Sequence, residues 1–458
     1  MRETVRGWLL TARTPRGRAL AAALGVGFVL RLAWGLWVQR RLPEPLLGGD
    51  GYAYWFHANE IAHGRGYHQY ECPPPAPLPC DGPPTAYYPI GFPALLAVVF
   101  FLDRGWLPGG QPQLVALINV AAGTASIALI FVIGRSVFGP RVGVAAAWAL
   151  ALYPSMIIGV ATYSIETTFI VVVLGLAVLL IRHAWPQAMS NRELVGFGVA
   201  LGIAVQIRPF VAPIVVGLAV AVRVAGLSWR QVARHVLVPV GVTGVLLVPW
   251  TIRNAVQLDA FVPLSTNLGD TMCLSRYPGS DGGFAWARHE WCADPTLPEA
   301  ALNSANIGAA LSFIAEHPDE EVVQWWRRLR QMMANDRFTM VEALAAGSVA
   351  LPAGVRTGVD RVSDVVFALS WILSIPGAVL LTRGWRRDRA TGARRAIVAV
   401  TAAGLAAIPL LLWGAVRFHA PLIPFFCLLA SATVVGAPAW WRSRHALADG
   451  SAPGSARG

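Results

Sequence analysis

Long apolar stretches separated by short polar connections recur along most of this 458-residue chain. A stretch of about 18 or more residues with few charges is long enough to cross a membrane as a helix. We expect about ten spans of this length or nearly so, at 19–39, 112–134, 141–160, 163–182, 193–207, 209–222, 235–252, 364–382, 396–413 and 418–437. The pattern predicts an all-α polytopic membrane protein, with its transmembrane domain in residues 1–437 and a disordered cytoplasmic tail in residues 438–458.

A further apolar stretch, 88–102, is shorter and contains Pro89 and Pro93. Because proline interrupts helical hydrogen bonding, we interpret this stretch as a re-entrant or interfacial helix and not as a span. The short connections that carry arginine then all face the same side, as expected for cytoplasmic loops. Two long loops, 40–111 and 253–363, lie on the opposite, extracytoplasmic side and contain most of the acidic residues.

The composition and the net charge agree with this topology. Hydrophobic residues make up 55% of the chain and charged residues only 14%, which excludes an ordinary soluble protein. The net charge of +12 resides on arginine, mostly in the cytoplasmic connections, so it indicates orientation and contact with anionic lipids rather than nucleic-acid binding. Arginines before the first apolar stretch predict an uncleaved anchor. Abundant arginine, alanine and glycine without lysine suggest a bacterial plasma membrane protein.

Four of the five cysteines lie in the two long loops. Cys72 and Cys80 belong to the first loop, Cys273 and Cys292 to the second, and Cys427 to the last span. An oxidising exterior favours two disulfides, Cys72–Cys80 and Cys273–Cys292. The alternative is four free thiols, since the spacings match no zinc motif.

Asp50 opens the polar part of the first loop, in the stretch Gly48-Gly49-Asp50-Gly51. One interpretation is a helix N-cap, because a carboxylate is favourable at a helix N-terminus. The other is a catalytic carboxylate, since the glycines let a large lipid-linked substrate approach closely. Tyr52, Tyr54 and His57 follow at helical spacing, where aromatic rings suit either a sugar face or the membrane interface.

Short motifs follow one another in order along most of the chain. They are Gly49-Asp50-Gly51-Tyr52, Ile61-Ala62-His63-Gly64-Arg65-Gly66-Tyr67, Tyr88-Pro89-Ile90-Gly91-Phe92-Pro93, Ser164-Ile165-Glu166, Gln206-Ile207-Arg208-Pro209, Pro249-Trp250-Thr251-Ile252-Arg253-Asn254 and Arg417-Phe418-His419-Ala420-Pro421. Taken together, this series resembles the GT-C glycosyltransferases, in particular the protein O-mannosyltransferases and the aminoarabinose transferases that modify lipid A.

The resemblance implies a GT-C fold and a transferase that uses a polyprenyl-phosphate-linked sugar, with Asp50 as the catalytic base. Protein mannosyltransferases usually have a second acid directly after that residue, whereas this chain has Gly51. The acceptor therefore stays open between a protein, a lipid and a glycan. The sequence does not select the sugar either.

Four further charged residues, Glu166, Arg208, Arg253 and Arg417, fall at the outer ends of predicted spans, on the same side as Asp50. Charges from several spans at one membrane face suggest a shared site, although each alone is also consistent with an interfacial group that reaches water. Because a guanidinium forms paired hydrogen bonds with phosphate, we assign binding of the donor phosphate first to Arg208 and Arg417.

Glu166 is a candidate either for assisting Asp50 or for holding a divalent metal, Mg²⁺ or Mn²⁺, that would neutralise the leaving phosphate. No cluster at ligand spacing requires a metal. Arg253, Tyr88 and the ring residues of the first loop are candidates for substrate binding. The histidines His57, His289 and His419 are candidate bases, although a neutral, hydrogen-bonded histidine is the commoner case.

The second loop is expected to cover the site and select the acceptor, with an amphipathic stretch at 300–333 lying at the membrane interface. Two classes of function fit the topology. A transporter or lipid-linked-sugar flippase usually contains internal repeats and places charges nearer the bilayer centre. Dissimilar halves and charges at one face favour an enzyme. The sequence thus predicts an inverting glycosyltransferase that uses a polyprenyl-phosphate sugar, with Asp50 as general base.

Overall fold

The computed structural model describes residues 14–39, 50–69, 82–103, 110–285, 290–344, 351–383, 385 and 387–448. Within these residues all regular secondary structure is helical, apart from one isolated bridge between His68 and Pro84. The α-helices are α2 (Pro15–Gln39), α3 (Asp50–Ala62), α4 (Gly91–Leu102), α5 (Gly110–Val137), α6 (Pro140–Ala151), α7 (Pro154–Ile158), α8 (Glu166–Ile181), α9 (Asn191–Ile207), α10 (Pro213–Val224), α11 (Trp229–Leu258), α12 (Leu268–Cys273), α13 (Glu299–Glu316), α14 (Pro318–Met332), α15 (Phe338–Leu344), α16 (Ala353–Thr382), α17 (Arg389–Leu411) and α18 (Ile423–Ala448). The 3-10 segments are η1 (Gly159–Ala161), η2 (Pro209–Val211) and η4 (Val416–Leu422).

Six helices of the described chain are long and apolar enough to cross a membrane: α2, α5, α11, α16, α17 and the η4–α18 segment Val416–Gly436. The bent pair Pro140–Ala151 and Pro154–Ala161 adds a seventh if it counts as one span. The protein is thus an all-α, multi-pass membrane protein, as predicted. The number of ten spans is not confirmed, because stretches such as 163–182 form shorter helices. The 16 residues of α8 extend roughly 24 Å, less than the hydrocarbon core of about 30 Å.

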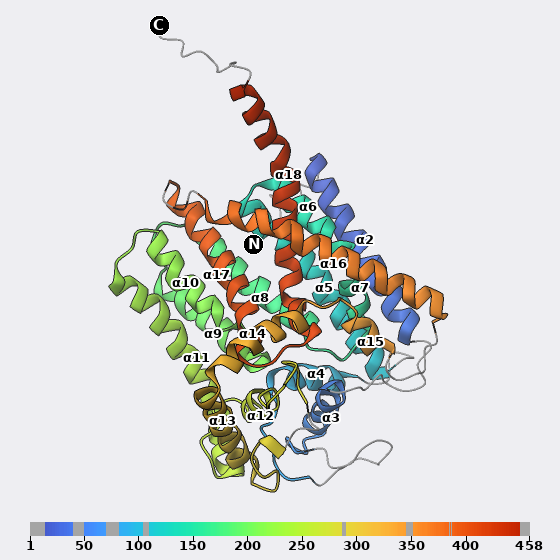
Figure 1. Cartoon of the computed structure of the whole chain (residues 1–458), viewed down its shortest axis with the longest axis vertical. Helices are drawn as coiled ribbons and strands as arrows, with labels where there is room; N and C mark the ends of the chain where they lie inside the picture. The colour runs from blue at the N-terminus through green and yellow to red at the C-terminus, as the bar shows by residue number, and fades with distance from the viewer. Residues whose placement is uncertain are drawn as a thin grey trace.

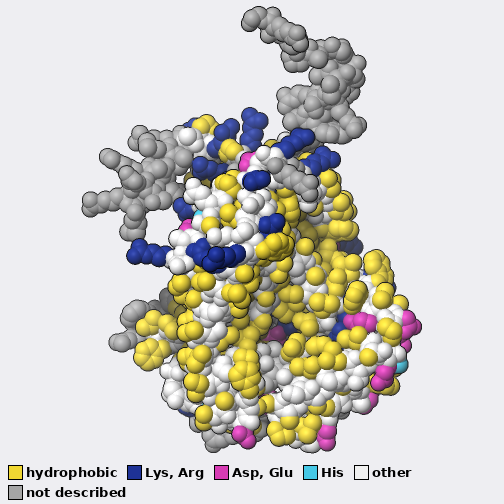
Figure 2. All heavy atoms as spheres, turned by 90° about the vertical axis from the view of Figure 1, so that its left-hand side faces the viewer, with side chains coloured by type: hydrophobic (Ala, Val, Ile, Leu, Met, Phe, Trp, Pro, Cys, Tyr) yellow, Lys and Arg dark blue, Asp and Glu magenta, His cyan; other side chains and the backbone are white. Residues whose placement is uncertain are grey.

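Four helices of the two long predicted loops gather at one end of the molecule. α3, α4, α12 and α13 lie at the end opposite to the one where α18 leads to the C-terminus (Figure 1). On the face drawn in Figure 2, arginines gather near the α18 end, acidic side chains gather toward the other end, and an apolar belt separates them. This distribution agrees with the charge asymmetry of the sequence.

The bounds of two helices can be compared with the predicted topology. The stretch 88–102 forms the 12-residue helix α4, which is too short to cross a membrane and packs against α3 and α9. α16 begins at Ala353, well before the predicted start at residue 364. Its first turns carry the exposed residues Arg356 and Arg361, so a polar extension precedes the apolar part of this helix.

Small residues allow α5 and α6 to pack closely in the core. A Cβ atom added to Gly134 would lie 2.8 Å from the Cα of Gly143, and one added to Gly143 would lie 2.8 Å from the carbonyl oxygen of Phe131. Membrane helices lack a hydrophobic driving force for association and depend on such close contacts. The core around this contact includes Ile127, Ile130 and Leu150.

The second loop contains the predicted disulfide between Cys273 and Cys292. The other predicted pair, Cys72–Cys80, lies outside the described residues, as does His289. At the C-terminal end the structure differs from the prediction of disorder from residue 438, because α18 continues to Ala448.

Candidate active site

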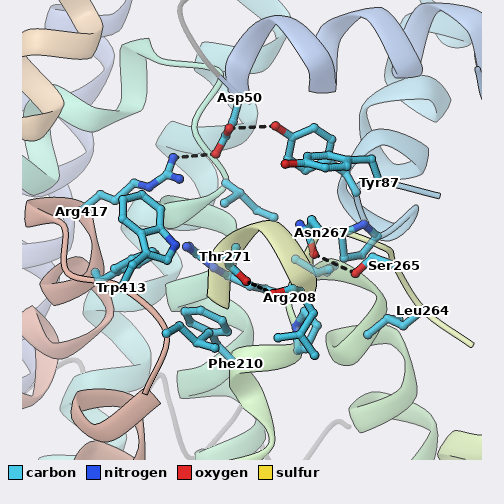
Figure 3. Close-up of a pocket in the computed structure, with 18 of the residues that line it drawn as sticks. Asp50, Tyr87, Arg208, Phe210, Leu264, Ser265, Asn267, Thr271, Trp413 and Arg417 are labelled. Carbon is cyan, nitrogen blue, oxygen red and sulfur yellow. Dashed lines mark hydrogen bonds and ion pairs between the residues drawn. The ribbon is translucent and has the colours of Figure 1, made fainter. Parts of the chain in front are cut away.

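Asp50 is the first residue of α3, and two side chains from other parts of the chain hold its carboxylate (Figure 3). The Arg417 guanidinium donates to Oδ2 over 2.6 Å, and the Tyr88 hydroxyl donates to Oδ1 over 2.9 Å. The Asp50 side chain is nevertheless 31% exposed. Its carboxylate is therefore oriented by two partners and remains accessible to a substrate.

The charges around Asp50 keep its carboxyl group ionised. Burial on its own raises the pKa of Asp50, but the Arg417 guanidinium, the Tyr88 hydrogen bond and the more distant charge of Arg208 together lower it below its usual value. Both the N-cap and the catalytic interpretation of Asp50 are compatible with its position at the start of α3. The arginine partner adds a feature that an N-cap does not need.

A second ion pair joins Arg208 and Glu166. The Nη1 atom of Arg208 lies 3.0 Å from Oε1 of Glu166, and both side chains are largely buried. The Ser164 hydroxyl donates to the other oxygen of this carboxylate. The Arg208 guanidinium also lies 5.0 Å from the ring centre of Phe210, and Phe169 and Phe418 lie nearby. These contacts fix the orientation of the guanidinium.

The local backbone explains why Arg208 lies at this site. It follows the last residue of α9 and has extended dihedral angles, φ −155° and ψ 120°, because the next residue, Pro209, disfavours the helical conformation before it. The end of α9 also touches the loop before α4. A Cβ atom on Gly91 would lie 2.5 Å from the carbonyl carbon of Gln206, so glycine is required there. This contact brings Tyr88 and Arg208 into one cavity.

Arg417 is positioned by η4, which follows α17 after a short connection. The last carbonyl groups of α17 have no partners within the helix. Arginines from the second loop supply them: Arg328 donates to the Leu410 carbonyl over 2.8 Å, and Arg276 donates to the Leu411 carbonyl over 2.7 Å. The second loop thereby holds the segment that leads into Arg417.

The two arginines of this contact share one buried carboxylate, that of Glu321. Arg276 lies 2.8 Å from it and Arg328 lies 2.7 Å from it, and both arginine side chains are almost completely buried. We call Arg276, Glu321 and Arg328 the arginine clasp. A buried charge requires such pairing, because desolvation is otherwise costly.

Asp50 and the two arginines face a cavity of about 500 Å³, a size that suits a small molecule or the head of a larger one. Figure 3 shows Arg417 and Tyr87 on either side of Asp50. The lining consists of Asp50, Tyr54, Tyr87, Tyr88, Pro89, Ile165, Ile207, Arg208, Pro209, Phe210, Leu264, Ser265, Asn267, Leu268, Thr271, Phe284, Leu412, Trp413, Arg417 and Phe418. We call this the first cavity. It combines a charged wall with a broad apolar wall.

The predicted residue Arg253 lies elsewhere. Its guanidinium donates to the carbonyl oxygens of Tyr67 and Thr85, both over 2.6 Å, and stacks on Trp250. These contacts anchor the first loop to the end of α11. Arg253 therefore does not join the charged residues that line the first cavity.

Three other predicted residues also lie apart from the lining of the first cavity. His57 stacks on Tyr67 inside the first loop, and burial, with the charges of His68 and Arg253, lowers its pKa to about 3. His419 lies 3.0 Å from Asp336 and stacks on Phe367, so it fixes η4 against α16. Tyr52 is half-buried next to the rings of Trp55 and Phe56.

Several lining residues were not predicted. The Tyr87 hydroxyl donates to Asp270 over 2.9 Å, and the Asn306 amide donates to the same carboxylate over 2.8 Å, which joins the first loop to α12 and α13. Trp413 lies at the end of a predicted span, where an interfacial tryptophan is expected anyway. Leu264, Ser265 and Asn267 belong to the stretch Phe261-Val262-Pro263-Leu264-Ser265-Thr266-Asn267, which continues the series of family-like motifs, although no role was assigned to them.

The described residues do not fit a divalent metal. Among them, no three His, Cys, Asp or Glu side chains group together. Asp50 and Glu166, the two carboxylates considered as ligands, are each neutralised by an arginine. A divalent cation prefers several oxygen ligands without a competing positive charge.

Comparisons with known proteins agree with this architecture. Residues 89–252 match the family described as dolichyl-phosphate-mannose-protein mannosyltransferase. No curated protein matches the chain. The oligosaccharyltransferase of Archaeoglobus fulgidus, solved with a tethered acceptor peptide, has a TM-score of 0.54 and 14% identity over 94% of this chain and 50% of its own. The same enzyme in complex with zinc and sulfate has a TM-score of 0.52, again with 14% identity over 94% and 50% of the two chains.

A structure of ArnT from Cupriavidus metallidurans bound to undecaprenyl phosphate is also similar, with a TM-score of 0.39 and 15% identity over 93% of this chain and 78% of that one. The present chain spans about half the length of the archaeal oligosaccharyltransferase. The structural similarity to the archaeal oligosaccharyltransferase shows that the chain has the GT-C fold.

Proposed function

We propose that this protein transfers a sugar from a polyprenyl-phosphate donor to a hydroxyl group outside the cytoplasm of a bacterium, with Asp50 as general base. The ion pair between Asp50 and Arg417 at the wall of the first cavity carries this proposal. The description of the matching family, which names a dolichyl-phosphate sugar, supports the donor class. The 1–437 transmembrane domain and the catalytic first loop, 40–111, belong to the same proposal.

The lining of the first cavity suits an amphiphilic donor. Arg208 and Arg417 present two guanidinium groups for the phosphate. Phe210, Leu264 and Leu268 offer an apolar surface for the first isoprene units, and Tyr54 and Tyr88 offer ring faces for the sugar. A polyprenyl-phosphate sugar consists of a sugar, a phosphate and an isoprenoid chain, joined in that order.

The ion pair between Arg417 and Asp50 also implies that the donor binds before the acceptor is deprotonated. Without donor, Arg417 neutralises Asp50, which makes this carboxylate a weak base. A donor phosphate competes for the same guanidinium, so Asp50 loses part of its counter-charge and becomes a stronger base once the donor is bound. Tyr88 keeps the carboxylate oriented during this exchange.

The bond changes follow from these roles. The acceptor oxygen attacks the anomeric carbon as its proton passes to Asp50. The bond between the anomeric carbon and the phosphate oxygen breaks, and the polyprenyl phosphate leaves with the electron pair. Arg208 and Arg417 stabilise that negative charge. A direct displacement of this kind inverts the configuration of the anomeric carbon.

The test is transfer from a panel of radiolabelled polyprenyl-phosphate sugars in membranes, with the wild-type protein and an Asp50→Asn variant of equal expression. We expect one sugar to be transferred with inversion, and the variant to lose at least about a thousandfold in rate. Retention of configuration contradicts the displacement mechanism. Movement of an unconsumed lipid-linked sugar across the membrane would instead support a flippase.

A further inference from the structure

A second cavity, of about 550 Å³, adjoins the first. Phe284, Trp413 and Arg417 line both cavities and so form a common wall. The rest of its lining comes from the second loop, the end of α14, the start of α15 and the connection to η4: Tyr277, Asp281, Gly283, Ala285, Gln331, Asn335, Arg337, Phe338, Val341, Gly414, Ala415 and Val416. The mechanism above assigns no role to this space.

Backbone contacts give the second cavity a defined shape. The Gly414 amide donates to the Gly282 carbonyl over 2.8 Å, which ties the connection before η4 to the second loop. Gly282 has φ +87°, a conformation that favours glycine. A Cβ atom on Gly414 would lie 2.6 Å from the Arg328 backbone, so the connection before η4 packs closely against α14.

Each charged side chain that lines the second cavity already has polar partners within the protein. Arg337 donates to Asp364 over 2.8 Å, and Arg417 is paired with Asp50. The Asp281 carboxylate accepts from the Gly283 amide over 2.8 Å and from the Gln331 amide over 2.9 Å. Arg417 is reserved for the donor phosphate in the proposed mechanism, Arg337 is paired with Asp364, and the Asp281 carboxylate repels an anion, so this surface favours a neutral ligand over a phosphorylated or acidic one.

The remaining chemistry suits a sugar. The rings of Phe284 and Trp413 lie 5.0 Å apart, and apolar C–H faces of sugar rings pack on such aromatic surfaces. Gln331 and Asn335 provide amides that both donate to and accept from hydroxyl groups. Among the described residues, the Trp413 indole N–H has no hydrogen-bond partner, so it adds an available donor at the common wall.

We propose that the second cavity is an acceptor subsite for a neutral sugar residue, so that the acceptor is a glycan. This inference rests on the proposed function and names its acceptor class. A sugar seated against Trp413 presents a hydroxyl group toward Arg417, whose guanidinium reaches the base Asp50. A peptide acceptor would need backbone hydrogen-bond partners, and a lipid acceptor would need an uninterrupted apolar groove.

The test is saturation-transfer NMR on the full chain in lipid nanodiscs, which avoids detergents with sugar head groups. The probes are neutral mannose, arabinose and galactose trisaccharides and a serine- and threonine-containing peptide. The variants are Gln331→Leu and Asn335→Leu, with Gln257→Leu as a matched control because Gln257 is exposed on α11, away from both cavities. We expect one trisaccharide to bind wild type and control equally, and to bind both cavity variants at least about tenfold more weakly.

Two results would overturn the subsite. One is sugar binding that is unchanged in both cavity variants, and the other is binding of the peptide but of no trisaccharide. Binding of the polyprenyl-phosphate donor is measured on the same samples. A wild-type protein that binds the donor but no trisaccharide contradicts only the subsite, whereas a wild-type protein that binds no polyprenyl phosphate contradicts the proposed function itself.

Discussion

Arg417 and Asp50 form an ion pair of 2.6 Å although 367 positions separate them along the chain. One belongs to η4 near the C-terminal end and the other begins α3 in the first loop. The pair therefore exists only when the last span and the first loop are both in place. This relationship joins the fold to the proposed chemistry, and it makes Arg417 the first residue to change.

Replacing Arg417 by methionine should abolish donor use. The substitution removes a ligand of the donor phosphate that also stabilises the leaving group, so we expect kcat/KM for the donor to fall by at least about a hundredfold. Arg417→Lys keeps a charge but loses the planar fork, and should retain an intermediate activity. The measurement is initial-rate kinetics with a labelled donor.

The matched control for this change is Arg230→Met, because Arg230 is an exposed arginine in the first turn of α11 and does not line the first cavity. Its kinetics should equal those of the wild type. If Arg417→Met binds and uses the donor normally, Arg417 has no part in phosphate recognition.

Tyr88→Phe should shift the acid limb of the pH–rate profile to higher pH. The Tyr88 hydroxyl and Arg417 both lower the pKa of Asp50, so removing the hydroxyl raises that pKa. More base is then protonated at a given low pH, and the rate falls earlier as the solution is acidified. An unchanged acid limb would mean that the titrating group is not Asp50.

The same pKa shift predicts the pH dependence of stability. Because the folded-state pKa of Asp50 lies below its unfolded value of about 3.9, the Asp50–Arg417 pair stabilises the fold above that pH. The contribution is lost as the pH falls through the lowered folded-state pKa. Thermal unfolding of wild type and Asp50→Asn should therefore differ at neutral pH and converge in strong acid.

Periodicity and charge were sufficient to predict a helical, multi-pass membrane protein. Asp50 was selected from the first-loop motif, and Arg208 and Arg417 from their places at the ends of apolar stretches; the structure places all three at the first cavity. The same rule selected Arg253, whose guanidinium instead reaches the backbone of the first loop. The position of a residue at one membrane face does not reveal the direction in which its side chain points.

The sequence also could not reveal contacts between the second loop and the core. Arg276 and Arg328 look like ordinary charges of an extracytoplasmic loop, yet both are buried against the end of α17. Asp270 likewise is recognisable as a partner of Tyr87 only when the two loops are folded together. Such contacts depend on tertiary structure, for which local pattern carries no signal.

The arginine clasp should be important for stability. Glu321→Gln leaves two buried arginines without their shared counter-charge, and breaking a buried pair in this way costs about 3–5 kcal/mol. We expect a lower unfolding temperature and, since the clasp holds the segment before Arg417, a higher KM for the donor. Glu316→Gln is the control, because Glu316 is exposed in the neighbouring α13. Equal melting of both variants would contradict a structural clasp.

Glu166→Gln separates a positioning role from a catalytic one. Glu166 pairs with Arg208, receives the Ser164 hydroxyl and does not contact Asp50 in the described structure, so we expect it to orient Arg208 for the donor phosphate. The variant should then raise the donor KM by about tenfold and change kcat by less than about threefold. Arg208→Met should raise KM at least as much and also lower kcat, because its guanidinium stabilises the leaving phosphate, and the double variant should be no worse than Arg208→Met alone. A large loss of kcat in Glu166→Gln, equal to that of Asp50→Asn, would instead assign Glu166 a direct part in proton transfer.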